Sequence, residues 1–220
     1  RAASAAAALA SSNVNSLGDW TTQTADPGDL WRALGPEVVE LMAAAGDREA
    51  QYSWGYRLLL DADEAGGFGG DADALGASGR SPLGDEGMAL LEKSAGQGHA
   101  HASIALGQVH LARKEHEQAV AWFRKAAEAG LPTAMFNFGV CLDMGQGVAV
   151  DYPAAAEWFR RAAEAGDGMA ADTLCHMYKT GRGVTRSKRR AMQCLRKAAE
   201  NGYVTSCYSL AGHIYADEPY

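Results

Sequence analysis

The histidines and cysteines are the residues of this sequence whose side chains could bind a metal or act in catalysis. His99 and His101 stand two residues apart, and His110 and His116 follow them. No Cys, Asp or Glu completes a recognisable set of zinc ligands around them. The cysteines do not form the close pairs of a zinc site, and a helical domain of this length does not need disulfides. We therefore expect surface or junction histidines, and reduced, buried cysteines at Cys141, Cys175, Cys194 and Cys207.

One acidic segment has part of the pattern of a calcium-binding loop. Asp61 and Asp63 are followed by Gly66, but Ala65 and Ala72 stand at the fifth and twelfth positions, where oxygen ligands are needed. We therefore interpret the segment as a flexible acidic loop without calcium.

Catalytic motifs are absent from the sequence. Asp172 and His176 lie one turn apart on a predicted helix, but an acid–base pair also needs a nucleophile and a pocket, and the sequence shows neither. No serine-hydrolase, phosphate-loop, zinc-protease or dinucleotide-binding motif is present. The sequence therefore predicts no cofactor, no metal and no enzymatic activity.

Charge narrows the range of partners. The 220 residues include 27 Asp and Glu against 20 Lys and Arg, a formal net charge of −7. General affinity for nucleic acid needs clustered basic residues, so we expect no DNA partner. No apolar stretch approaches the roughly 20 residues of a membrane-spanning helix. We expect no transmembrane segment, and peripheral membrane association only through partner proteins.

One basic run stands out at the start of a predicted helix, where the partial positive charge of the helix N-terminus does not favour cations. It consists of Arg186, Lys188, Arg189 and Arg190. The run indicates either contact with an acidic group, on a protein, an RNA or a lipid head group, or a solvated charged face.

Short motifs recur every 36 residues, and they reveal the elements that position these side chains. One column follows the motif Ala-Ala-Glu-Ala/Asn and ends in glycine, at Gly130, Gly166 and Gly202. A second column holds pairs of apolar residues, Trp122-Phe123, Trp158-Phe159 and Cys194-Leu195. A third holds small residues, at Gly55, Gly107, Gly139, Cys175 and Ala211. The columns agree through one deletion and one insertion, which indicates a repeat array.

Each full repeat predicts two helices joined by a glycine turn. In residues 131–166, apolar residues at helical spacing form the first helix, and the small Gly139 lets the second helix approach closely. A Gly-x-Gly-Val turn follows at 145–148, where glycine adopts backbone angles that other residues resist. Asp151 marks the start of the second helix, and Gly166 ends it as a left-handed cap.

The pattern of residues 134–166 closely resembles the Sel1-like repeat, a relative of the tetratricopeptide repeat. It reads Ala-x4-Gly, Gly-x-Gly-Val, Asp-x-Pro, then Ala-x2-Trp-Phe-Arg-Arg-Ala-Ala-Glu-Ala-Gly. The resemblance is good over 100–130 and 170–202 and weaker over 31–98. It implies an all-α fold, a right-handed α-α superhelix (solenoid) of helical hairpins, whose first helices line a concave face that holds other proteins. Such an array exposes a large surface because each repeat contacts only its neighbours.

We expect the solenoid to span residues 31–220, after an Ala/Ser-rich extended segment at 1–30. Its repeats are a partial one at 31–46, full ones at 47–98, 99–130, 131–166 and 167–202, and a partial one at 203–220. The repeat 99–130 lacks the glycine turn and must turn more tightly near Lys114. The repeat 47–98 carries an acidic, Gly-rich insertion at 61–84, of a kind that is usually functional or disordered.

The first helices should present two rows of side chains opposite the core. The first row is Tyr52, Ile104, Phe136, Asp172 and Tyr208, and the second is Tyr56, Gln108, Val140, His176 and Gly212. Such a mixture suits a protein-binding groove, although part of the first row could pack against neighbouring helices. The aromatic column of Trp122, Phe123, Trp158 and Phe159 shares the register of the small residues, and therefore predicts core rather than a ligand cage.

These observations favour a non-catalytic protein–protein interaction scaffold, an accessory or assembly subunit of a larger complex, in an organellar membrane system. The alternatives are a transient regulatory or quality-control adaptor that binds client proteins, and a peripheral subunit of an RNA-containing particle. The Ala-rich and Ser-rich start at Arg1 is typical of an imported precursor, or of an arbitrary fragment start. We expect a chloroplast or mitochondrial location, with the cytoplasm or the ER lumen as alternatives.

Overall fold

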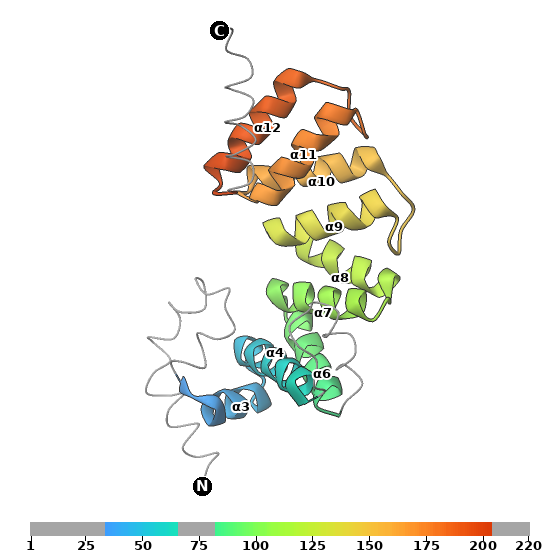
Figure 1. The fold of residues 1–220 in the computed structure, drawn as a ribbon. Helices are drawn as coiled ribbons and strands as arrows, with labels where there is room; N and C mark the ends of the chain where they lie inside the picture. The colour runs from blue at the N-terminus through green and yellow to red at the C-terminus, as the bar shows by residue number, and fades with distance from the viewer. Residues whose placement is uncertain (1–33, 66–81, 204–220) are drawn as a thin grey trace. The chain divides into compact units, whose positions relative to one another are not determined.

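The computed structural model describes residues 34–65 and 82–203, and every regular element in these ranges is an α-helix (Figure 1). The first helices are α3 (Pro36–Ala44), α4 (Arg48–Ala65), α6 (Pro82–Gly96) and α7 (Ala100–Ala112). They are followed by α8 (His116–Glu128), α9 (Pro132–Met144), α10 (Tyr152–Glu164), α11 (Gly168–Thr180) and α12 (Lys188–Glu200). The predicted all-α fold is confirmed. Among the described helices, none has the length and apolar character needed to cross a membrane.

The described residues form two compact units, divided after Glu115. In the first unit, α4 packs against α3 and α6, and two glycines face each other where α4 meets α6. A Cβ placed on Gly55 would lie 2.8 Å from the carbonyl oxygen of Gly87, and a Cβ on Gly87 equally close to the oxygen of Gly55. The predicted role of the small-residue column, to let paired helices approach, therefore holds at Gly55. Leu59, Leu91 and Leu106 are buried in this unit.

In the second unit, α8 to α12 follow one another as a stack (Figure 1). The core is formed by the predicted apolar column, since Phe123, Phe159 and Leu195 are each only 1% exposed. Asp151 caps α10, because its carboxylate accepts a hydrogen bond from the Ala154 N–H at 2.9 Å. Gly166, just beyond α10, has the predicted left-handed backbone, with φ of 103°.

The glycine turns dock onto the preceding second helix through the main chain. Gly145 and Gly147 have φ of 69° and 70°, a region that favours glycine. A Cβ on Gly147 would overlap the backbone of His116 at the start of α8. One repeat later, a Cβ on Gly183 would overlap the backbone of Tyr152 at the start of α10. Glycine is therefore required here for close approach as well as for its φ angle.

The repeat 99–130 has a short turn between its two helices, as expected from the absence of the Gly-x-Gly-Val segment. Only residues 113–115 separate α7 from α8, and the boundary between the two compact units falls at the end of this turn. Lys114 has φ of 62°, the left-handed conformation that glycine usually takes. The Glu115 N–H donates to the His110 carbonyl oxygen at 2.8 Å and closes the turn.

The acidic insertion is shorter than the predicted 61–84. Helix α4 continues through Ala65 and α6 begins at Pro82, so Asp61 and Asp63 are helical rather than in a loop. Alanine and glutamate favour the helix here, and Arg57 pairs with Asp61 one turn later at 2.8 Å. Residues 66–81 lie outside the described residues, as do the predicted segment 1–30 and the repeat residues from 204 to 220, which include Cys207, Tyr208 and Gly212.

Candidate functional site

The first predicted row is largely buried in the first unit. Tyr52 is only 6% exposed, and its ring centroid lies 4.5 Å from that of His99 at the start of α7. Ile104 is 8% exposed. Tyr52 was a candidate for partner binding, with packing against a neighbouring helix as the alternative, and the structure shows it packed because α4 turns the tyrosine toward α7. The second row is more accessible, since Tyr56 is partly buried and Gln108 is exposed.

A buried hydrogen bond between a histidine and a carboxylate, which spacing did not suggest, lies beside Tyr52. The Nε2 atom of His99 is 3.0 Å from a Glu49 carboxylate oxygen, and both residues are buried. The Nδ1 atom of His99 accepts a hydrogen bond from the Ala102 N–H at 3.1 Å, so the Nε2 atom carries the proton that Glu49 accepts. His99 is thus a junction histidine, as predicted, and its side chain caps the N-terminus of α7. Among the residues the structure describes, no cluster of three or more ligand side chains could hold a metal ion.

Helix α9 presents an accessible face in the second unit. Phe136 and Val140 are partly buried, and Met144, one turn further on, is 63% exposed. These three residues are spaced by four and therefore lie on one face of the helix. On α11, Asp172 is partly buried and His176 is exposed. Phe136 also contacts the core, because its ring lies 5.6 Å from that of Phe159.

The basic run is exposed at all four positions, Arg186, Lys188, Arg189 and Arg190. Ser187 caps α12 by accepting a hydrogen bond from the Arg190 N–H at 3.3 Å. The Arg190 guanidinium lies over the Tyr178 ring of α11, 5.7 Å from its centroid. The Arg190 side chain therefore turns toward a neighbouring helix.

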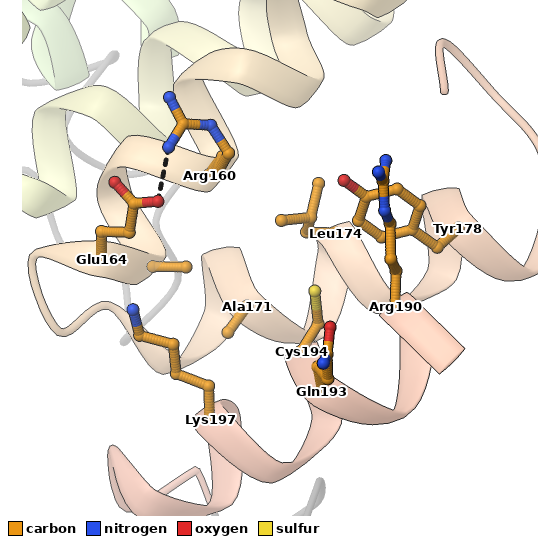
Figure 2. Close-up of a pocket in the computed structure, with 10 residues that line it drawn as sticks. Arg160, Glu164, Ala171, Leu174, Tyr178, Arg190, Gln193, Cys194 and Lys197 are labelled. Carbon is orange, nitrogen blue, oxygen red and sulfur yellow. Dashed lines mark hydrogen bonds and ion pairs between the residues drawn. The ribbon is translucent and has the colours of Figure 1, made fainter. Parts of the chain in front are cut away.

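Arg190 is also one of the residues that line a cleft of about 260 Å³ formed by α10, α11 and α12 (Figure 2). Each helix contributes residues from one face, at spacings of one, three, four or seven. The lining residues are Arg160, Ala163 and Glu164 of α10, Ala171, Leu174 and Tyr178 of α11, and Arg190, Gln193, Cys194 and Lys197 of α12. Figure 2 shows the Cys194 sulfur pointing toward Leu174, with cationic side chains around this apolar floor.

The aromatic column proves to be only partly core. Phe123 and Phe159 are buried as predicted, whereas Trp122 and Trp158 are partly buried. Trp158 packs edge-on against Phe138, with 5.3 Å between ring centroids, because it faces the seam between α9 and α10. A cation covers each indole: Arg161 lies 4.9 Å from the Trp158 ring, and Lys125 lies 5.1 Å from the Trp122 ring.

The described cysteines are free thiols, and Cys141 and Cys175 are buried. Cys194, in contrast to the prediction, is only partly buried, because it lines the cleft. Burial raises the pKa of the Cys141 thiol to about 11, and burial together with nearby Cys175 does the same to the pKa of Cys194. These thiols are therefore poor nucleophiles at neutral pH.

Sequence reasoning identified one member of the cleft, Arg190, and missed the others. The available signal was the column Trp122, Trp158 and Cys194, in which the last repeat breaks the aromatic pattern. The alignment of the repeats shows the replacement of tryptophan by cysteine at position 194, but it does not show that a cleft results.

Comparison with known proteins identifies the repeats. The model of the Sel1 repeat matches residues 103–131, 132–167 and 169–203. A protective antigen with an SLR fold from uropathogenic Escherichia coli, c5321, aligns with a TM-score of 0.65 and 33% identity, over 82% of this chain and 36% of that one. A Sel1 repeat protein from Oxalobacter formigenes aligns with a TM-score of 0.64 and 26% identity, over 84% of this chain and 72% of that one.

This chain thus spans about a third of the length of the Escherichia coli antigen. No curated protein matches the sequence. The matched repeats coincide with the helical hairpins from α7 to α12. Between residues 103 and 203 the chain thus contains three Sel1 repeats, and its structural neighbours are Sel1-repeat proteins, which is consistent with a Sel1-repeat protein of the tetratricopeptide-like superfamily.

Proposed function

We propose that this chain is an accessory or assembly subunit that binds other proteins within a larger complex. Sel1-repeat proteins generally mediate protein–protein interaction and are of a non-catalytic scaffold type. The observation that carries the proposal is the accessible face of α9, where Phe136, Val140 and Met144 form one apolar row.

The composition of this row suits a protein partner. Phe136 is anchored against Phe159, so its ring is held in place before a partner arrives, which lowers the entropy lost on binding. Met144 has a flexible, polarizable side chain that adapts to the surface it meets. A fixed aromatic residue beside an adaptable one is the arrangement expected at the centre of an interface.

Native purification tests the proposal. The tagged protein, isolated at native abundance, is expected to comigrate with partner proteins in stoichiometric amounts. The variant Val140→Asp/Met144→Asp should lose those partners while keeping its helicity and melting temperature. The matched control, Ala121→Asp, changes an exposed position on α8 and should retain them. A strictly monomeric native protein would refute the proposal.

The same purification separates the two alternatives. A transient adaptor would release its clients during a wash in high salt, whereas an assembly subunit would retain its neighbours. Membership of an RNA-containing particle would appear as comigration that ribonuclease abolishes. The location in a chloroplast or mitochondrion stays a prediction from composition, and imaging of the full-length tagged protein tests it.

A further inference from the structure

The cleft in the second unit lies where the preceding repeat carries an aromatic cluster. In the repeat of α9 and α10, the rings of Phe138 and Trp158 pack together at 5.3 Å between centroids. Two cations cover them from outside, Arg124 at 5.3 Å from the Phe138 ring and Arg161 at 4.9 Å from the Trp158 ring. The cluster thus consists of two rings between two cations.

The next repeat keeps the cations and loses both rings. Thirty-six residues after each member of that cluster stand Arg160, Leu174, Cys194 and Lys197 in place of Arg124, Phe138, Trp158 and Arg161. All four line the cleft of about 260 Å³. Leucine and cysteine are smaller than phenylalanine and tryptophan, so the cleft is the space that the missing rings would fill.

The cations around the cleft are only partly neutralised. Arg160 is paired with Glu164 at 2.5 Å and with Glu157 at 2.6 Å. Arg190 and Lys197 form no ion pair with a carboxylate among the residues the structure describes. The segment from Thr173 to Ala199 contains eight of the 20 Lys and Arg residues and no Asp or Glu, in a chain whose net charge is −7. The charge of this surface is therefore opposite to that of the chain as a whole.

We propose that the cleft binds an aromatic side chain from an acidic segment of a partner protein. The aromatic ring takes the place of the missing rings, in contact with Leu174 and Cys194, and the Lys197 ammonium lies near its face. Carboxylates on either side of the aromatic residue in the partner pair with Arg190 and Lys197. This inference rests on the proposed function and names the chemistry of one partner.

A protein segment fits this cleft better than a nucleic acid does. Glu164 lines the cleft from α10, and Glu157 lies two turns earlier on the same helix, so both would repel a phosphate backbone that crossed the cleft beside α10. A peptide can direct its carboxylates toward α12 alone. The apolar floor of Leu174 and Cys194 also suits contact with an aromatic ring.

Binding of a designed peptide tests the proposal. The probe is a fluorescein-labelled peptide with one tryptophan flanked by aspartates and glutamates, and its anisotropy is measured with the full chain. Replacing its tryptophan by serine, or its acids by their amides, should each weaken binding by at least about tenfold, the usual loss for removing an interface anchor. Bound peptide should also slow alkylation of Cys194, followed by mass spectrometry at alkaline pH.

Two charge-reversal variants locate the binding. Arg190→Glu/Lys197→Glu removes the unpaired cations of the cleft and should weaken binding by about tenfold or more. Arg189→Glu/Arg196→Glu is the matched control, because it changes the same charge at the same spacing on the same helix but outside the cleft. The control should weaken binding by less than about threefold. In both variants a glutamate replaces an arginine in the first turn of α12, where a negative charge is favourable.

Restoring the repeat residue gives an independent test. Cys194→Trp should fill the cleft, raise the melting temperature and abolish peptide binding. If this variant does not fold, the two charge-reversal variants decide.

Several results would overturn the proposal. They are equal loss of binding in the two charge variants, unchanged peptide affinity in a folded Cys194→Trp, and no peptide binding at all. Tighter binding of a uridine oligonucleotide or of phosphatidylserine vesicles, lost equally in both charge variants, would assign the basic surface to RNA or to membrane instead. Partners that still copurify with the wild-type chain in those cases would leave the proposed scaffold function standing.

Discussion

The ring of Phe159 occupies the space that a side chain at position 139 would need. A Cβ placed on Gly139 would lie 2.8 Å from Cε1 and 3.0 Å from Cδ1 of that ring. Phe159 is only 1% exposed, so its ring is enclosed on its other sides and has no room to move away. The packing of α9 on α10 therefore depends on the absence of a side chain at one position.

Gly139→Ala is expected to lower the free energy of unfolding by roughly 1–3 kcal/mol, the usual cost of overpacking a filled core. Urea unfolding followed by circular dichroism measures the change. Gly96→Ala is the control, because a Cβ at that helical position meets nothing within 4 Å. The control should gain up to about 1 kcal/mol, since alanine favours helix more than glycine does. A neutral Gly139→Ala would show that the two helices are further apart.

The two aromatic neighbours on α10 should differ in their contribution to stability. Phe159→Ala removes a buried ring and should cost roughly 3–5 kcal/mol. Trp158→Ala removes a partly buried indole that contacts Phe138 and Arg161, and should cost roughly 2 kcal/mol. Both values come from chemical denaturation of the single variants. An equal loss in the two variants would mean that the indole is as enclosed as the phenyl ring.

Stability should decline below neutral pH in part because of His101. Burial, and then the proximity of His99, lower the pKa of His101 below its ordinary value of 6.5, and Glu49 opposes them. The unfolded chain therefore binds a proton more readily, so stability is complete above the unfolded pKa and is lost as the pH falls below about 6.5. Denaturation midpoints measured from about pH 7.5 to about pH 5 should show this loss, and His101→Gln should reduce it.

The ion pair between Asp143 and Arg182 should show an asymmetric response to mutation. The Arg182 Nη2 atom lies 2.5 Å from the Asp143 Oδ2 atom, and the side chains are 41% and 10% exposed. Arg182→Ala should cost roughly 1–2 kcal/mol because it leaves a mostly buried carboxylate without its cation. Asp143→Ala should cost less, because water and the Tyr152 ring still accommodate the arginine. A double-mutant cycle measures the coupling, and symmetric losses would contradict this account.

The repeat array could be predicted because its signals are local in the sequence. The columns through Gly139 and Phe159 repeat at a fixed interval, and each turn glycine sits at a constant offset from them. The surface was harder to predict. Tyr52 is buried against His99, which is 47 residues further along the chain. The periodicity of a helix does not show which of its sides contacts a neighbour so distant in the sequence.

The cleft shows a second limit of sequence reasoning. The replacement of tryptophan by Cys194 was evident from the columns, but a cleft also required the loss of the ring at Leu174, one helix earlier. Two substitutions that are separate in the sequence act on one volume. Only coordinates show that they meet.

The glycine turns have a consequence for how such a chain can change over time. Gly147 contacts the backbone of His116, and Gly183 contacts the backbone of Tyr152. The same main-chain contact therefore forms at two residues whose side chains are unrelated. Because main-chain atoms form the joint, point mutations at positions 116 and 152 leave its shape intact. An in-frame duplication of one 36-residue unit would carry a complete joint with it. The architecture therefore lets genes lengthen or shorten the array by recombination, while the exposed residues of each copy diverge toward new partners.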